Sequence, residues 1–154
     1  NENKDIKKAL YWLEKAVEQG YMYAQSNLAR IYADGVGVDQ DWEKAFDLYK
    51  KAAKQGEVDS LCCLGHMHEK GYGVTQNYEK AINWYRKAID QGDADSMFFL
   101  GMLYLEGKGV EKSLPDAAYW INLARQDKDG NALTAKKEAE KVWTEKGLSK
   151  YLKE

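Results

Sequence analysis

One short segment concentrates the side chains that most often bind metals or act as nucleophiles: Cys62, Cys63, His66, His68 and Glu69. Cys62 and His66 are four residues apart, so they share one face of a helix, and Glu69 lies one step further along it. Thiolate, imidazole and carboxylate groups are candidate zinc ligands. However, Cys63 points about 100° away from Cys62 around the helix, and the sequence has no other cysteine or histidine. We therefore expect packed or solvated side chains, and predict no metal and no cofactor.

The same residues do not form a catalytic arrangement. A cysteine hydrolase pairs its nucleophile with a histidine across the fold, whereas both cysteines and both histidines here lie within one predicted helix. The glycine-rich segments at Gly35, Gly71 and Gly107 suggest phosphate binding at a helix N-terminus. None of them follows a predicted strand or precedes the Gly-Lys-Ser/Thr of a phosphate loop. The sequence therefore predicts a protein that is not an enzyme.

The composition argues against two further classes of function. The chain of 154 residues has 23 lysines and arginines against 25 aspartates and glutamates, which argues against nucleic-acid binding. No apolar run approaches the length of about 18 residues that a membrane helix needs, so we expect no membrane insertion. The chain opens with Asn1 rather than Met, which favours a processed or truncated start and leaves the compartment open.

A repeat of 36 residues organises the whole chain. Its glycine columns are Gly20, Gly56 and Gly92; Gly35, Gly71 and Gly107; and Gly37, Gly73 and Gly109. Its alanine columns are Ala9, Ala45, Ala81 and Ala117, and Ala16, Ala52, Ala88 and Ala124, with Trp12, Leu48, Trp84 and Trp120 between them. These residues fall at i, i+3 and i+7, on one face of a helix. Aromatic columns at this spacing favour packing between helices over a cofactor or carbohydrate site.

Each repeat is predicted to be two helices joined by a glycine loop. Gly35 and its equivalents end the first helix, because glycine adopts a left-handed conformation most easily. The predicted N-caps of the second helix are Asp5, Asp41, Asn77 and Ser113. The expected helices span 5–19, 21–34, 41–55, 57–70, 77–91, 93–106, 113–127 and 131–146, with a short piece at 148–153. Such hairpins must stack, because a lone one buries too little apolar surface.

The columns together resemble the Sel-1-like repeat, a relative of the tetratricopeptide repeat. The resemblance runs from Leu28-Ala29 through Tyr32, Gly35-x-Gly37-Val38, Lys44-Ala45, Leu48-Tyr49 and Ala52 to Gly56, and more closely from Leu64-Gly65 to Gly92. It implies one domain, 1–154, with a half repeat at 1–20, full repeats at 21–56, 57–92 and 93–128, and C-terminal capping helices at 129–154. The implied fold is all-α, a right-handed α-solenoid whose first helices line a concave surface. The resemblance also implies a bacterial protein, located either in the cytoplasm or in the periplasm, or secreted.

Beyond residue 128 the repeat pattern decays into a predicted capping helix. Its expected inward residues are Ala132, Ala135, Ala139, Val142 and Trp143.

The expected partner surface lies beside the core stripe of the first helices. Its residues vary from repeat to repeat, as in a surface that contacts a partner, although a solvated strip varies too. They are Tyr23, Ser26, Arg30 and Ala33; Asp59, Cys62, His66 and Glu69; and Asp95, Phe98, Met102 and Leu105. The trio Phe98, Met102 and Leu105 is too apolar for a purely solvated face. Either it contacts the partner, or the capping helix covers it.

We therefore expect a non-catalytic scaffold that binds a partner protein or peptide in its concave groove, with Phe98 as an apolar anchor and Arg30 as a reader of charge. A narrower alternative is an inhibitor or immunity protein for one toxin or enzyme. Another class, a cell-wall-active β-lactam-binding hydrolase, occurs among cysteine-rich members of the resembled family. Those have a cysteine pair in each repeat, which this sequence lacks. The chain is alternatively the scaffold segment of a longer protein; partner identity and oligomeric state stay open.

Overall fold

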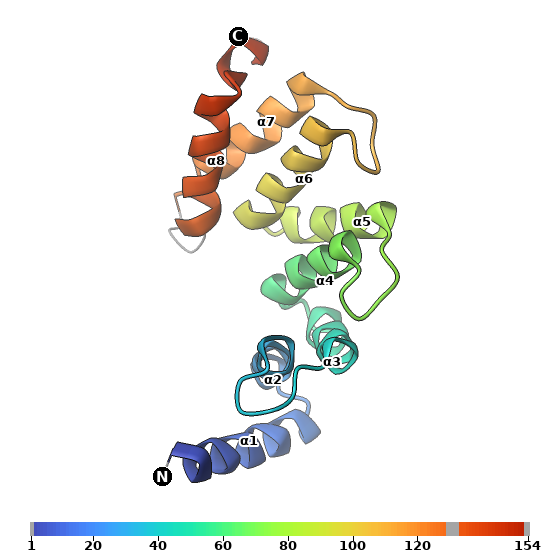
Figure 1. Cartoon of the computed structure of the whole chain (residues 1–154), viewed down its shortest axis with the longest axis vertical. Coiled ribbons are helices and arrows are strands. Elements are labelled where there is room, and N and C mark those ends of the chain that lie inside the picture. Colours follow the sequence, from blue (N-terminus) through green and yellow to red (C-terminus); the bar gives the residue numbers. More distant parts are fainter. Residues whose placement is uncertain (1, 129–132, 153–154) are drawn as a thin grey trace. The chain divides into compact units, whose positions relative to one another are not determined.

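α-Helices and their connecting loops make up residues 2–128 and 133–152, the part of the chain that the computed structural model describes (Figure 1). Within these ranges there is no strand. The chain divides into two compact units, Asn1–Gln76 and Asn77–Glu154, and helices that are consecutive in sequence pack against each other within each unit. The predicted all-α class is therefore confirmed.

The first unit contains four helices: α1 (Glu2–Glu18), α2 (Met22–Asp34), α3 (Trp42–Lys54) and α4 (Val58–Lys70). The helices α2 and α3 form a hairpin, with α1 packed on α2 and α4 packed on α3. The alanine, leucine and tyrosine columns of the repeat form the buried side of this hairpin, namely Leu28, Ala29, Ala45, Leu48, Tyr49 and Ala52. Small residues at these positions let the helix backbones approach closely.

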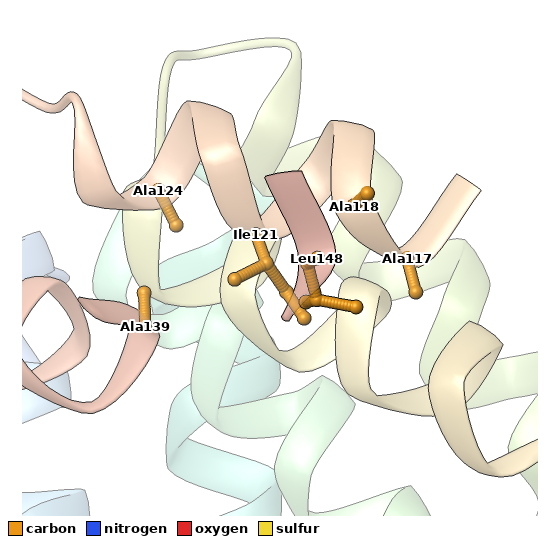
Figure 2. Packing of buried hydrophobic residues seen from close by; sticks show 6 residues of the cluster. All are labelled: Ala117, Ala118, Ile121, Ala124, Ala139 and Leu148. Atoms are coloured by element: carbon orange, nitrogen blue, oxygen red, sulfur yellow. The ribbon is translucent and has the colours of Figure 1, made fainter. Parts of the chain in front are cut away.

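The second unit contains α5 (Tyr78–Ile89), α6 (Ala94–Glu106), α7 (Leu114–Arg125), α8 (Leu133–Glu145) and the 3-10 helix η1 (Leu148–Tyr151). The helix α8 packs on both α6 and α7, and η1 packs on α7 and α8. Figure 2 shows the resulting core cluster, in which Ile121 and Leu148 lie beside Ala117, Ala118, Ala124 and Ala139.

The helix starts follow the predicted capping pattern in three of four places. Asp41, Asn77 and Ser113 each accept a hydrogen bond at their side-chain oxygen from the backbone N–H three residues later, at 2.9, 2.9 and 3.3 Å. The prediction for Asp5 is wrong, because α1 already begins at Glu2. The other caps follow a glycine loop that breaks the helix, whereas residues 1–4 include neither glycine nor proline.

The loop glycines adopt the left-handed conformation that the sequence predicts. Gly35, Gly71 and Gly107 end their helices with φ of 68°, 74° and 68°. The second glycine of the loop has a further role, because a Cβ atom on Gly73 would lie 2.5 Å from the carbonyl oxygen of Trp42. This glycine therefore lets the loop of one repeat lie against the start of the second helix of the preceding repeat.

The capping helix α8 turns its small residues inward. Ala135 and Ala139 are buried, and Val142 and Trp143 are half-buried against the cluster of Figure 2. These four residues lie as predicted, while Ala132 lies outside the described residues. The Arg125 guanidinium on α7 also stacks over the Trp143 ring at 4.8 Å, which holds α8 against α7.

One member of the Trp12, Leu48, Trp84 and Trp120 column departs from the predicted packing. Trp12 on α1 is 62% exposed, whereas its equivalent Leu48 on α3 is 6% exposed. The expectation of packing between helices is therefore wrong for Trp12, because α1 packs against α2 in a way that leaves this side chain mostly in solvent.

Candidate functional site

The predicted partner surface in the first unit begins on α2. Tyr23 is 68% exposed, Arg30 is exposed, and Ser26 is half-buried between them. The Ser26 hydroxyl donates a hydrogen bond to the Tyr23 carbonyl oxygen at 3.2 Å. This hydroxyl is therefore already bonded within α2. Ala33, the last residue predicted on this strip, is buried. The exposed groups on this strip of α2 are therefore the phenol of Tyr23 and the guanidinium of Arg30.

The equivalent strip on α4 is more enclosed. Asp59 is exposed, His66 and Glu69 are half-buried, and Cys62 is buried, so its thiol is not available to a partner. Glu69 pairs with the neighbouring Lys70 at 3.0 Å. The strip therefore offers a carboxylate and part of an imidazole.

An aromatic group encloses His66. Its ring lies 6.0 Å from the Tyr72 ring, edge to face, and Tyr72 stacks on Trp42 at 4.6 Å. Burial lowers the pKa of His66, and Lys70 lowers it too, although the Glu69 carboxylate opposes both effects. His66 is therefore held toward its neutral form.

The hydroxyl of Tyr49 is a polar group on the buried side of α3. It forms a hydrogen bond with the Cys63 side chain, and the charges of Asp34 and Arg30 act on it. Burial, the largest cause, raises the pKa of Tyr49 far above its usual range. Tyr49 thus joins α3 to α4 close to the exposed strip of α2. The signal in the sequence is a tyrosine, repeated at Tyr85, in a column that has Leu13 and Ile121 in the first and last repeats.

The strip in the second unit is covered in part by the chain itself. Asp95, Phe98, Met102 and Leu105 are all half-buried. The three apolar side chains pack against the cluster of Figure 2, which α7, α8 and η1 build. Phe98 also packs against Ala135 of α8. Of the two explanations, coverage by the capping helix therefore accounts for the packing of Phe98, while the cluster of α7, α8 and η1 accounts for that of Met102 and Leu105.

The segment with Cys62, Cys63, His66, His68 and Glu69 holds the candidate metal ligands of the sequence. Within the described residues, no three His, Cys, Asp or Glu side chains gather so as to hold a metal ion. Neither Cys62 nor Cys63 forms a disulfide bond within the part of the chain that the structure describes. Across the same ranges, no helix combines the length and the apolar character needed to cross a membrane.

A shallow hollow of about 600 Å³ borders the outer side of α8. Its lining residues are Lys136, Lys137, Glu140, Lys141 and Thr144. The Lys136 ammonium donates to the Asp127 carbonyl oxygen at 3.0 Å, and Glu140 pairs with Arg125 at 2.8 Å. These contacts fix α8 to the end of α7, so Lys136 and Glu140 have structural roles.

Comparisons with known proteins identify the repeat. The family model described as Sel1 repeat matches residues 2–21, 23–57, 59–93 and 94–128. A Sel1 repeat protein from Oxalobacter formigenes is 28% identical, with a TM-score of 0.76 over 97% of this chain and 58% of that chain. A protective antigen of uropathogenic Escherichia coli that displays an SLR fold is 30% identical, with a TM-score of 0.75 over 89% of this chain and 29% of that chain.

A smaller relative matches nearly end to end. Cysteine-rich protein B of Helicobacter pylori is 27% identical, with a TM-score of 0.60 over 86% of this chain and 97% of that chain. No curated protein matches the sequence. These neighbours confirm the predicted α-solenoid fold. The chain spans 58% and 29% of the lengths of the Oxalobacter and Escherichia proteins.

Proposed function

Because this chain belongs to the Sel1 repeat family, whose members are generally protein-interaction scaffolds, we propose that it is a non-catalytic scaffold that binds a partner protein or peptide through the exposed strip of its first helices. The contact surface begins on α2 with Tyr23 and Arg30 and continues on α4 with Asp59 and the accessible part of His66. The partner contributes the chemistry or signal, and this chain contributes the binding surface.

The observation that carries this proposal is the exposure of Tyr23 beside that of Arg30. Tyr23 is 68% exposed. The other full repeats have a carboxylate at this position, Asp59 and Asp95, so an exposed aromatic side chain is particular to α2. A large aromatic side chain and an arginine dominate the binding energy of many protein interfaces. Neither residue is needed by the core of the first unit, so an interface gives both a role.

In this proposal Tyr23 takes the role of apolar anchor that the sequence suggested for Phe98. Phe98 packs against α6 and α8 residues of its own unit. Truncating Phe98 would therefore destabilise the capping end whether or not a partner binds there, and its effect on affinity would be ambiguous. Tyr23 has no such structural cost, because most of its surface already faces solvent.

The test compares two double variants of the whole chain. The partner is first captured on immobilised protein and identified by mass spectrometry, and its affinity is then measured by calorimetry. Tyr23→Ala with Arg30→Ala should weaken binding at least about tenfold, the loss expected for truncating interface anchors. The control, Tyr119→Ala with Lys137→Ala, removes from the second unit an aromatic side chain that is 52% exposed and an exposed cation, and it should bind normally. Equal affinities of all three proteins would remove the α2 strip from the proposal.

A further inference from the structure

One face of α2 has an ordered set of exposed groups. Tyr23, Arg30 and Asp34 are all exposed, and they lie at i, i+7 and i+11, which places them on one side of the helix. Because a helix rises about 1.5 Å per residue, Arg30 is about 10 Å from Tyr23 along the axis and about 6 Å from Asp34. We call these three residues the α2 ridge. It presents a phenol, a cation and a carboxylate in that order.

The α2 ridge is a polar face of the repeat and is distinct from its apolar core stripe. The equivalent residues on α4 are Asp59, His66 and Lys70. Asp59 and Lys70 are exposed and His66 is half-buried, although the hairpin of α2 and α3 precedes α4. By contrast, Leu28 and Ala29 of the core stripe are buried. The position of the ridge in the repeat therefore leaves it accessible even where a complete hairpin lies ahead of the helix.

The two opposite charges of the α2 ridge do not neutralise each other. Arg30 and Asp34 are about one helical turn apart, yet neither belongs to an ion pair among the residues that the structure describes. At a similar spacing on α1, Lys15 and Glu18 do pair, at 2.9 Å. Both charges of the ridge therefore remain available to groups of a partner.

Asp34 lies at an unfavourable position in its own helix. It is the last residue of α2, where the negative end of the helix dipole disfavours a carboxylate. The equivalent on α4 is Lys70, whose charge suits this end, and the equivalent on α6 is Glu106, which pairs with Lys108 at 2.6 Å. In the first unit Val36 occupies the position of Lys108. Asp34 therefore lacks the compensation that Glu106 has, and the cation of a partner would supply it.

The spacing of the α2 ridge fits a helix of the partner better than an extended chain. A helix that lies along α2 repeats the same separations, so side chains on one of its faces meet all three residues of the ridge. An extended chain rises about 3.3 Å per residue, so its residues opposite the ridge would be about three and then about two positions apart. Because its side chains alternate between two faces, an extended chain cannot present all three toward α2.

We propose that the α2 ridge binds an amphipathic helix of the partner that has a carboxylate and a cation one turn apart and a large apolar residue two turns from the carboxylate. The carboxylate accepts hydrogen bonds from the Arg30 guanidinium, the cation donates to Asp34, and the apolar residue packs on the Tyr23 ring. The order of the two charges then selects the partner. This inference rests on the proposed function, because it gives the chemistry of the partner at the same strip.

The test reverses the order of the charges and keeps the net charge. In the variant Arg30→Asp with Asp34→Arg, the cation lies at the end of α2 that the helix dipole favours, so the melting temperature should not fall. The probe is a phage-displayed library of short helical segments with one face randomised, selected on the immobilised intact chain. The enriched segments should share the apolar residue, the carboxylate and the cation at the stated spacings. Selection on the reversed variant should exchange the acidic and basic positions.

Fluorescence anisotropy then compares the selected segments on both chains. Each segment should bind the chain of opposite charge order at least about tenfold more weakly. The control, Asp47→Lys with Lys51→Asp, reverses two exposed opposite charges at the same spacing on α3 and should enrich the same segments as the unaltered chain.

Enrichment of the same segments on the unaltered and reversed chains would overturn the inference. If those segments still bound Tyr23→Ala more weakly, the proposed function would stand without it. Segments that tolerate both Tyr23→Ala and the reversal, or a library without any enrichment, would overturn the inference and the proposed strip together.

Discussion

The helices α1 and α7 have the same pattern of residues but different surroundings. Both have alanine, tryptophan, an aliphatic residue and alanine at matching positions of the repeat. On α7 the pair α6 and α8 covers that stripe, and Ile121 is fully buried. On α1 the stripe is open and Trp12 is mostly exposed. The comparison teaches that the residue pattern of a helix determines which face is apolar. Whether that face is buried or exposed depends on the neighbouring helices.

The largest expected effect comes from truncating the aliphatic residue of the stripe on each helix. Ile121→Ala should lower the free energy of unfolding by about 3–4 kcal/mol, because it leaves a cavity in a closed cluster. Leu13→Ala on α1 should cost about 1 kcal/mol, because its side chain is only half-buried. Urea denaturation of the two variants measures the difference. Equal losses would mean that α1 is as well covered as α7.

The glycines allow the same comparison for the backbone. Gly56 and Gly73 both have positive φ, at 89° and 67°, but an added Cβ atom meets nothing within 4 Å at Gly56. Gly56→Ala should therefore cost about 1 kcal/mol, the strain of a left-handed alanine. Gly73→Ala should cost about 2–3 kcal/mol, because the methyl group also collides with the Trp42 carbonyl. Urea titrations that give equal values would show that the loop moves away freely.

A third comparison concerns one repeat position with two degrees of burial. Arg30 is exposed there on α2, while its equivalent His66 on α4 is half-buried, with a pKa below its ordinary value of 6.5. The unfolded chain then binds more protons than the folded chain below about pH 6.5, so acidification should reduce stability until the pH falls below the folded pKa. His66→Gln should flatten this part of the stability curve, measured by thermal denaturation between pH 7 and 5. An unchanged slope would contradict the pKa shift.

The smallest expected effect concerns two buried hydroxyl groups. Ser60 and Ser96 occupy equivalent positions, are fully buried, and have no hydrogen-bond partner for their hydroxyl oxygens among the described residues. Alanine already occupies this position in the first full repeat, at Ala24. Ser60→Ala and Ser96→Ala should therefore leave stability unchanged or raise it by about 0.5–1 kcal/mol. A clear destabilisation in urea would show that the hydroxyls are satisfied.

Much of the fold was predictable because its signals are local. The spacing of alanine and aromatic columns predicted the helices, and the glycines predicted the ends of the first helices. The caps at Asp41, Asn77 and Ser113 were also correct, since a cap needs only residues within the first turn. The prediction failed at Asp5 because the helix already includes the residues before it, from Glu2 onward, so Asp5 is not at a helix start.

The candidate surface was less predictable, because exposure depends on helices that are distant in sequence. The register placed Cys62 and Phe98 on the same strip as Ser26. In the structure Cys62 is buried and Phe98 packs against α8. The register alone gives the direction of a side chain from its own helix, and it carries no information about which other helix lies opposite.

By itself, the sequence determined the repeat, the helical hairpins, their caps and the Sel1 family, since each depends on residue types a few positions apart. Tertiary structure alone decided that Trp12 faces solvent, that Phe98 is covered, and that Gly73 lies against Trp42. The physical reason is that apolar burial and steric contact are properties of two surfaces together, and a repeated sequence describes only one of them at a time.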